Sequence, residues 1–152
     1  MKQTLINYIK NPKYDELYTP IEAIYPILKY LPKDKTYWEC TDFGNSNITK
    51  VLKENGYNVI STGKLKDGFD FLKDKPNFNF DIIITNPPYS LKTQFLKKAY
   101  SYEKPFAFLL PLTTLEGLDR RINFLKNKKS PWFAVAWFCW KLLPKDLIFE
   151  KV

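Results

Sequence analysis

The sequence predicts an α/β protein: a mostly parallel, doubly wound sheet in a single domain over residues 1–152, with an antiparallel strand at its C-terminal end. Segments typical of strands alternate with segments typical of helices as far as residue 111. The clearest strand, 80–85, is almost entirely apolar, as expected for a strand covered on both faces. After residue 111 only about eight residues precede the next extended segment, whereas a parallel crossover needs roughly a dozen or more. One helix-strand unit is therefore expected to be shortened.

In the first half of the chain, the pattern predicts a helix, a strand, a second helix and a second strand. Thr19 can cap a helix with Pro20 at its first position, and Pro26 should kink that helix. Ser46 or Asn47 can cap the next helix, which carries apolar residues at helical spacing. The predicted helices span residues 20–31 and 47–55, the predicted strands span 36–41 and 57–61, and a short element follows at 69–72.

The second half predicts two further buried strands with a helix between them. Ser90 can cap that helix, which runs to about Tyr102 and has lysines on its outer face. The tail, 142–152, is expected to pack on the edge of the sheet. The buried strands span 80–85 and 106–110, and extended segments follow at 120–125 and 132–140, joined by a basic turn at 126–131.

The charge and the aromatic content both favour nucleic acid as a partner. The net charge of the chain is +8, which favours a polyanion: nucleic acid first and an acidic membrane second. No basic amphipathic helix with a strong apolar face stands out, so no membrane partner is expected. Phe, Trp and Tyr make up 17% of the residues, an excess of flat rings that can either fill the core or stack on bases.

The rare and missing residue types exclude several chemistries. The chain has no histidine, which excludes Ser-His-Asp and Cys-His catalysis and the common histidine-based zinc sites. Cys40 and Cys139 both lie in apolar strand-like segments and form neither a disulfide framework nor a metal-ligand cluster, so no metal is expected. The N-terminus lacks a hydrophobic signal segment and no run approaches membrane-spanning length, so a cytoplasmic protein is expected.

Two polar loops come directly after predicted parallel strands. Residues 42–47 follow the first strand, and residues 86–89 follow the strand at 80–85. Ligands of such sheets bind outside the carboxyl ends of the strands. We therefore expect these two loops to form the functional site.

The second of these loops, Asn86-Pro87-Pro88-Tyr89, offers an unusual set of hydrogen-bonding groups. Pro87 and Pro88 make the loop rigid and extended and have no N–H, so their carbonyl oxygens are exposed acceptors. The Asn86 side chain adds one acceptor and two donors, and Tyr89 adds a flat ring. A planar exocyclic amine fits this loop, because it donates two hydrogens and its ring can stack. The alternative is a rigid strand-to-helix turn with Ser90 as the helix cap.

An Asn-Pro-Pro-Tyr sequence after an apolar strand resembles the signature of class I, Rossmann-like amino-methyltransferases, chiefly those that use S-adenosylmethionine to modify N6 of adenine. The resemblance implies that the Asn86 side chain and the Pro87 carbonyl accept hydrogen bonds from the target amine, and that Tyr89 stacks on the flipped base. The amine nitrogen then attacks the methyl group in line. The protein acts by positioning and electrostatics, so neither a histidine nor a covalent nucleophile is needed.

The resemblance covers most of the chain. Residues 36–47 look like the cofactor loop after the first strand, and Asp70-Phe71 looks like the acidic-aromatic pair near the cofactor's adenine. Segments 110–112 and 143–149 are similar to those of small phage-encoded adenine methyltransferase-like proteins. The cofactor-binding residues that the resemblance implies are Tyr18, Thr19, Pro20, Glu39, Thr41, Asp42, Phe43, Gly44, Asp70 and Phe71.

The sequence departs from the pattern of this family in its cofactor loop, after its second strand and in its length. Gly44 is the one glycine of the loop, where family members have several, and Glu39 or Asp42 remains to bind the cofactor's ammonium. Residues 61–64 lack the acidic residue that grips the ribose, and only Thr62 can hydrogen-bond there. The short chain leaves little room for a target-recognition domain, so loops of the chain, an oligomer or a partner protein are expected to supply specificity.

Basic residues interleaved with aromatic ones can form an edge that contacts phosphates, or a solvated hairpin turn. The candidates for nucleic-acid binding are Lys92, Arg120, Arg121, Lys126, Lys128 and Lys129. Three functions compete. The first is methyl transfer to N6 of adenine in nucleic acid, DNA before RNA, and the second is binding of DNA or a protein by a degenerate, non-catalytic member. The third is methylation of a protein glutamine, whose amide also fits the loop at 86–89.

Overall fold

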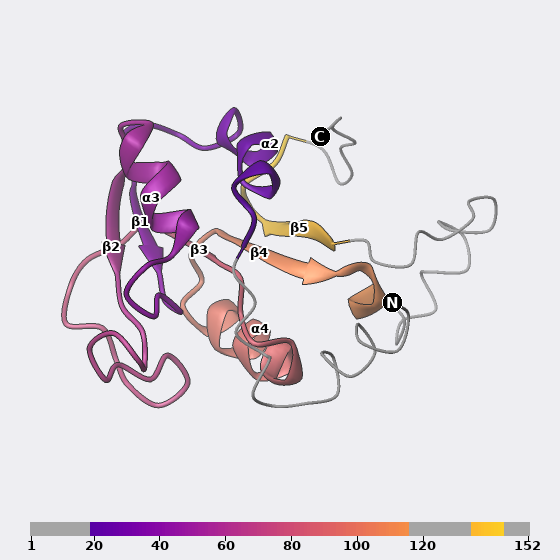
Figure 1. The fold of residues 1–152 in the computed structure, drawn as a ribbon. Helices are drawn as coiled ribbons and strands as arrows, with labels where there is room; N and C mark the ends of the chain where they lie inside the picture. The colour runs from indigo at the N-terminus through magenta and orange to yellow at the C-terminus, as the bar shows by residue number, and fades with distance from the viewer. Residues whose placement is uncertain (1–18, 116–134, 145–152) are drawn as a thin grey trace, which may run out of the picture.

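The computed structural model describes residues 19–115 and 135–144 of the chain (Figure 1). The segments predicted at 120–125 and 126–131 lie outside the described residues, as do Tyr18 and the end of the tail. In chain order the elements are the short helix η2 (Ile21–Ala23), α2 (Tyr25–Leu28), β1 (Thr36–Glu39), α3 (Asn47–Glu54), β2 (Asn58–Ser61), β3 (Ile82–Thr85), η3 (Tyr89–Leu91), α4 (Lys92–Ser101), β4 (Phe106–Pro111), η4 (Leu112–Leu115) and β5 (Val135–Trp140).

In the described part of the chain, five strands form one sheet in the order β2-β1-β3-β4-β5. β1 to β4 run parallel and β5 runs antiparallel to β4, which confirms the predicted α/β fold with its antiparallel C-terminal strand. The chain goes from β1 to one side for β2 and to the other side for β3, so the strand order reverses between β1 and β3. In open α/β sheets, ligands bind at the carboxyl ends of the strands that flank such a reversal.

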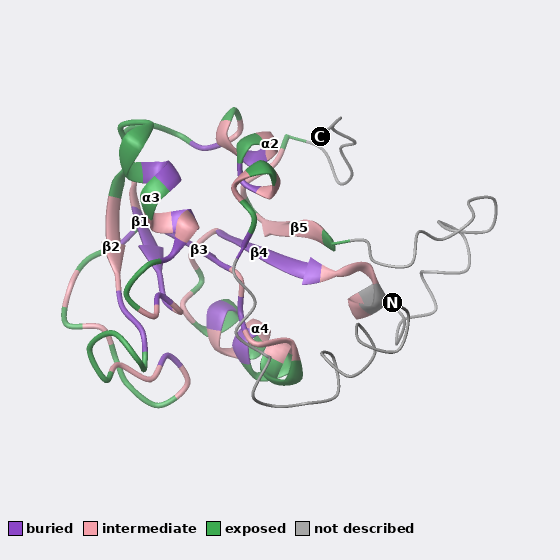
Figure 2. Cartoon of the chain, viewed as in Figure 1, coloured by how far each residue is buried: buried purple, intermediate pink, exposed green. Residues whose placement is uncertain are grey.

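Alternate side chains of the central strands face opposite cores. Tyr37 of β1 and Ile84 of β3 pack with apolar residues of α2 and α3. Trp38 and Ile83, one residue away in each strand, pack with those of α4. This period of two is expected of strands with helices on both faces. Figure 2 shows the result: β1, β3 and β4 are buried along the middle of the sheet, and β2 and β5 are partly exposed.

Trp38 is fully buried and organises the core on the α4 side of the sheet. The centroid of its ring system lies 4.8 Å from that of Phe80 and 5.3 Å from those of Phe71 and Phe78. Its indole N–H donates to Thr62 Oγ1 over 2.9 Å. Part of the aromatic excess in the composition is therefore core packing.

The predicted helix at 20–31 is wrong in its cap, while the interruption expected at Pro26 is present. Pro20 is the N-cap residue of η2, and it has no side-chain cap hydrogen bond, so Thr19 does not cap a helix. The helix is divided into η2 and α2, and Pro26 lies in the first turn of α2. Proline has no N–H to donate to the preceding turn, which explains why a new helix begins there.

One of the two predicted serine caps is correct. Ser46 is the N-cap residue of α3, and its Oγ accepts a hydrogen bond from the N–H of Thr49 over 3.4 Å. Ser90 is not a cap, because it lies inside η3 and Leu91 is the residue before α4. The chain after the two prolines therefore turns into a short helix before α4 begins, and this short helix takes the place of a side-chain cap.

The loop after β1 packs directly on the end of β2. The N–H of Thr62 donates to the carbonyl oxygen of Glu39, and the N–H of Asp42 donates to that of Thr62, each over 2.9 Å. Gly63 is buried, and a Cβ atom at this position would lie 1.7 Å from the carbonyl oxygen of Asp42. The close approach of these two backbones therefore requires a glycine.

We predict that Gly63→Ala lowers the free energy of unfolding by about 3 kcal/mol, because the added methyl group overlaps the Asp42 backbone. Urea unfolding followed by circular dichroism measures the change. Gly56→Ala is the matched control: Gly56 has a φ of +77° but open space around its Cβ position, so about 1 kcal/mol is expected. Equal losses in the two variants would contradict the close packing at Gly63.

Candidate functional site

The loops after β1 and β3 meet at the carboxyl edge of the sheet, where the strand order reverses. Thr41 lies two residues after β1, and its Oγ1 is 2.6 Å from Oγ1 of Thr85, the last residue of β3. The Thr41 hydroxyl also lies 3.3 Å from the carbonyl oxygen of Asn86. The predicted cofactor loop and the predicted amine-binding loop are therefore in direct contact.

Thr19 joins these loops from the N-terminal side. Its hydroxyl accepts a hydrogen bond from Asn86 Nδ2 over 3.0 Å, and its carbonyl oxygen accepts one from Asn47 Nδ2 over 2.9 Å. Thr19 is buried between its partners, which belong to the end of β3 and the start of α3. The sequence predicts that Thr19 and Pro20 border the site. In the structure, Thr19 contacts Asn86 at the end of β3 and Asn47 at the start of α3.

The loop at 86–89 has a fixed shape. Asn86 Nδ2 donates a hydrogen bond to Thr19, and the acceptor atom of the same amide, Oδ1, is buried. Pro87 is buried, while Pro88 and Tyr89 are half-buried. The Pro88 carbonyl oxygen accepts a hydrogen bond from the N–H of Leu91 over 2.9 Å, so it is not the exposed acceptor that the sequence predicts. The Tyr89 ring packs in part against the core on the α4 side of the sheet. The loop is therefore held both by this packing and by the hydrogen bond to Thr19.

Glu39, the last residue of β1, is 1% exposed, and donors surround its carboxylate. Oε1 accepts from Thr85 Oγ1 over 2.5 Å and from the N–H of Thr41 over 2.9 Å. Oε2 accepts from Ser46 Oγ over 2.9 Å. Burial raises the pKa of Glu39 and the charge of Asp42 raises it further, while the hydrogen bonds from Thr85, Thr41 and Ser46 offset this only in part. The carboxylate is therefore engaged inside the protein.

Asp42 shapes the loop itself. Its Oδ1 accepts from the N–H groups of Gly44 and Ser46 over 2.8 Å and 3.1 Å, and its Oδ2 accepts from Thr49 Oγ1 over 2.9 Å. Burial by itself raises the pKa of Asp42, but these hydrogen bonds outweigh it, so the pKa is lowered. Asp42 thus ties the loop to the first turn of α3.

The outer side of the same loop is open to solvent at Gly44 and Asn45. Gly44 adopts a φ of +111°, a conformation that residues with a side chain rarely take, and a Cβ atom there would meet nothing within 4 Å. Gly44 and Asn45 are exposed, and Phe43 is half-buried. The loop therefore presents its acidic groups inward and its backbone outward.

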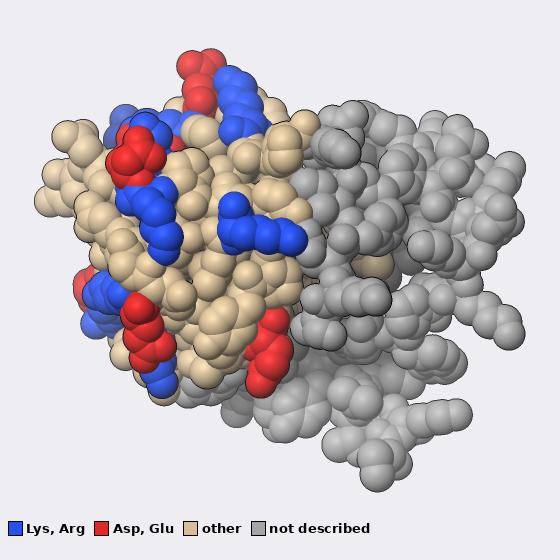
Figure 3. Space-filling model, turned by 90° about the horizontal axis from the view of Figure 1, so that it is seen from above, with Lys and Arg blue, Asp and Glu red and all other residues tan. Residues whose placement is uncertain are grey.

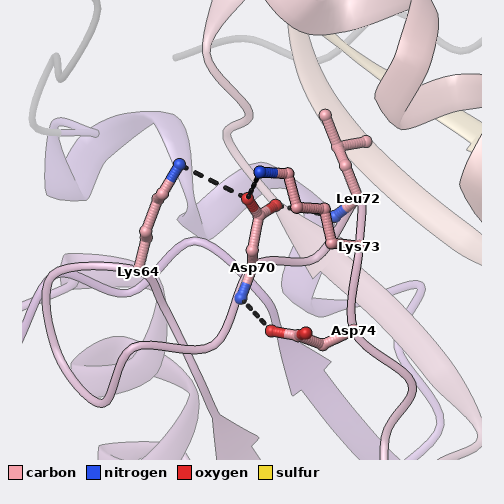
Figure 4. Close-up of polar contacts among 5 residues, drawn as sticks. All are labelled: Lys64, Asp70, Leu72, Lys73 and Asp74. Atoms are coloured by element: carbon pink, nitrogen blue, oxygen red, sulfur yellow. Dashed lines mark hydrogen bonds and ion pairs between the residues drawn. The ribbon is translucent and has the colours of Figure 1, made fainter.

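Asp70 and Phe71 are predicted to lie near the cofactor's adenine. The Asp70 side chain faces lysines near the surface, whereas the Phe71 side chain lies in the core. Asp70 Oδ2 lies 3.3 Å from Lys64 Nζ and 3.9 Å from Lys73 Nζ (Figure 4). Burial raises the pKa of Asp70, but a backbone N–H of its own turn and the two lysines more than offset it, and the pKa is lowered. Phe71 is buried and stacks on Phe95 at a centroid distance of 4.9 Å. Contact of this pair with a cofactor stays a prediction.

The sequence does not predict that three residues of this edge belong to the site: Thr85, Asn47 and Gly63. A hydroxyl at the end of an otherwise apolar buried strand signals a hidden hydrogen-bond partner, and for Thr85 that partner is Glu39. The sequence favours Asn47 only as a helix cap, whereas the structure places its amide on Thr19. No local signal marks Gly63, because its contact with Asp42 arises from the pairing of β1 with β2.

Lys92 is the one predicted nucleic-acid contact that lies among the described residues. Its Nζ donates to the carbonyl oxygen of Tyr89 over 3.4 Å, which places a positive charge beside the loop at 86–89. On the face drawn in Figure 3, basic and acidic side chains are intermixed over the described part of the chain. The other candidates, Arg120, Arg121, Lys126, Lys128 and Lys129, lie outside the described residues.

Neither a membrane helix nor a metal centre is found in the described part of the chain. None of the helices there has both the length and the apolar character needed to cross a membrane. No group of three or more His, Cys, Asp or Glu side chains in these ranges could hold a metal ion. Comparison with protein-family models and with curated proteins gives no match for this sequence.

We predict that Asp42→Asn destabilises the protein at neutral pH by about 1–3 kcal/mol, because charge-assisted hydrogen bonds to the loop are weakened. The pKa of Asp42 is lowered in the folded state, so its stabilising contribution is present above its ordinary value of 3.8 and is lost as the pH falls. The free energies of unfolding of parent and variant should therefore converge as the pH falls below 3.8 and through the lowered pKa of folded Asp42.

Denaturant unfolding across this pH range measures the difference. Asp34→Asn is the matched control, because the side chain of Asp34 is 76% exposed and a small effect is expected at every pH. A constant difference between Asp42→Asn and the parent across the range would contradict the role given to the Asp42 charge.

Proposed function

We propose that this chain transfers a methyl group from S-adenosylmethionine to N6 of adenine in nucleic acid, with DNA as the favoured substrate. The observation that carries the proposal is the contact between the loop at 86–89 and the loop at 41–46, on either side of the strand-order reversal. One loop would bind the exocyclic amine, and the other, whose outer side is exposed at Gly44 and Asn45, would lie against the methyl donor. Group transfer requires both reactants to be held within contact distance.

The Asn-Pro-Pro-Tyr loop would supply acceptors in fixed positions. Thr19 holds the Asn86 amide through its nitrogen, and the acceptor that would meet the amine is Oδ1, which is a buried atom. Together with the carbonyl oxygen of Pro87, it would hold the two hydrogens of the amine and turn the nitrogen lone pair toward the donor. Tyr89 would supply a ring on which the adenine, turned out of its strand, can stack.

When bound, S-adenosylmethionine supplies an electrophilic methyl group on a positively charged sulfur. It would supply the methyl group for the new N–C bond as its own S–C bond broke, and the surplus amine hydrogen would pass to water as a proton. The chain's own groups orient the amine and exclude competing geometries. A mechanism based on alignment needs no histidine, which agrees with a sequence that contains none.

The residues of the first loop fit this cofactor on their outer side. Phe43, Gly44 and Asn45 would hold it, because Gly44 has open space around it and Asn45 is exposed. The carboxylates of Glu39 and Asp42 are directed into the protein, so backbone groups and the Asn45 amide are the better candidates to meet the ammonium group.

A second candidate is a non-catalytic protein of the same fold that binds DNA or a protein partner. The polar groups that the sequence nominates for the cofactor already have partners within the protein. Glu39 is engaged by Ser46 and Thr85, and the Thr62 hydroxyl accepts from Trp38. On this second hypothesis, S-adenosylmethionine does not bind.

Asn86→Ala is expected to reduce methyl incorporation by about a hundredfold, because it removes a preorganised hydrogen bond that strengthens in the transition state. Transfer of a radiolabelled methyl group to DNA oligonucleotides, with RNA as a separate substrate, measures this effect. Asn79→Ala replaces an exposed asparagine ahead of β3 and should leave the incorporation unchanged.

The outcomes separate the two candidate functions. Incorporation that depends on Asn86 supports the enzyme. No incorporation into DNA or RNA, combined with no cofactor binding in calorimetry, supports the non-catalytic protein. An Asn86→Ala variant as active as the parent would remove the loop at 86–89 from the mechanism.

A further inference from the structure

We propose that Glu39 is a positioning residue for the amine-binding loop at 86–89 and not a ligand of the cofactor. Its carboxylate fixes the hydroxyl hydrogens of Thr41 and Thr85, and these in turn fix Asn86. The link to catalysis rests on the proposed function. The coupling between Glu39 and Asn86 is a property of the folded chain and can be measured without any activity.

The contacts of Glu39 lead toward the amine-binding loop. Thr85 immediately precedes Asn86 in the chain, and its Oγ1 lies within hydrogen-bonding distance of Glu39 Oε1, at 2.5 Å. Thr41 donates its N–H to the same oxygen, and its hydroxyl reaches the carbonyl oxygen of Asn86. Glu39 is therefore separated from Asn86 by one hydroxyl group along either route.

The Thr41 hydroxyl has one hydrogen and several acceptors within reach. Its Oγ1 lies 2.6 Å from Thr85 Oγ1, 3.1 Å from Glu39 Oε1 and 3.3 Å from the carbonyl oxygen of Asn86. An ionised Glu39 only accepts, so both hydroxyl hydrogens are drawn toward it. A neutral Glu39 brings a hydrogen of its own, which releases the Thr41 hydrogen for Asn86. The charge of Glu39 is thereby transmitted to the residue that holds the amine.

The surroundings of Glu39 favour its neutral form. Burial is the main cause of its raised pKa, and the negative charge of Asp42, in the following loop, adds to it. The neighbouring Cys40 thiol is buried too, and burial and Glu39 together raise the pKa of that thiol. α3 and β3 face Glu39 with the hydroxyls of Ser46 and Thr85. Glu39 therefore changes charge at a pH above its ordinary range, and it ionises as the pH rises.

Glu39→Gln tests the proposal, because glutamine keeps the shape and the contacts of the side chain but cannot ionise. Its carbonyl can accept from Thr41 and Thr85, and its amide can donate to Ser46. Heteronuclear NMR of the full chain follows the Asn86 side-chain amide from about pH 4 to about pH 9. In the parent, this signal is expected to shift with a midpoint above 4.5, the ordinary value for glutamate. In Glu39→Gln the shift is expected to disappear.

Two further variants keep the test decisive. Thr41→Val retains a β-branched side chain and the N–H donor to Glu39 but removes the hydroxyl that reaches the Asn86 carbonyl oxygen, so Asn86 should lose most of its pH response while Ser46 keeps its own. Asp42→Asn removes the neighbouring negative charge and should lower the midpoint without abolishing the response. A response of Asn86 that is unchanged in Thr41→Val contradicts transmission through that hydroxyl.

Calorimetry with S-adenosylmethionine separates positioning from binding. A positioning role predicts that Glu39→Gln changes the Kd of the cofactor by less than about twofold and slows methyl transfer about tenfold. A role as cofactor ligand predicts a Kd raised about tenfold or more. Asn86 signals that titrate alike in the parent and in Glu39→Gln overturn the proposal. A Glu39-dependent shift in a chain that transfers no methyl group supports the coupling and counts against the proposed function alone.

Discussion

A carboxylate in the core of a protein must be surrounded by donors, because an isolated buried charge costs on the order of several kcal/mol. Glu39 meets this requirement with the hydroxyl and amide groups of Thr41, Ser46 and Thr85. These donors belong to the loop after β1, the start of α3 and the end of β3. The hydrogen bonds that offset the desolvation cost of Glu39 therefore also connect the segments at the carboxyl edge of the sheet.

The second acidic side chain at this edge, Asp42, has a structural role. Asp42 binds the backbone of its own loop and the first turn of α3, and its carbonyl oxygen lies against Gly63 at the end of β2. The polar groups on the outer side of this loop, at Gly44 and Asn45, are neutral ones. Neutral acceptors suit the uncharged amine of adenine. Binding of the positively charged cofactor is therefore the property of this chain that most needs to be measured.

Most of the fold follows from local patterns, while the site depends on contacts that such patterns do not contain. The apolar run at 80–85 and the polar residue Ser46 before an amphipathic helix are read correctly, because each depends on its immediate neighbours. Ser90 is misread because the chain after the prolines enters a short helix at once. Thr19 is misread because its hydroxyl serves Asn86, far along the chain, and not the adjacent helix. The strand order brings such distant partners together, and the sequence predicts only that both loops lie at carboxyl ends.

We propose that a methyl donor binds where the strand order reverses between β1 and β3, and amide NMR shift mapping with S-adenosylmethionine can detect it there. We expect saturable changes that are largest at Gly44, Asn45 and Asn86 and that share one binding curve. No saturable change at about one millimolar cofactor, or changes centred on the opposite edge at Thr36 and Asn58, would contradict it.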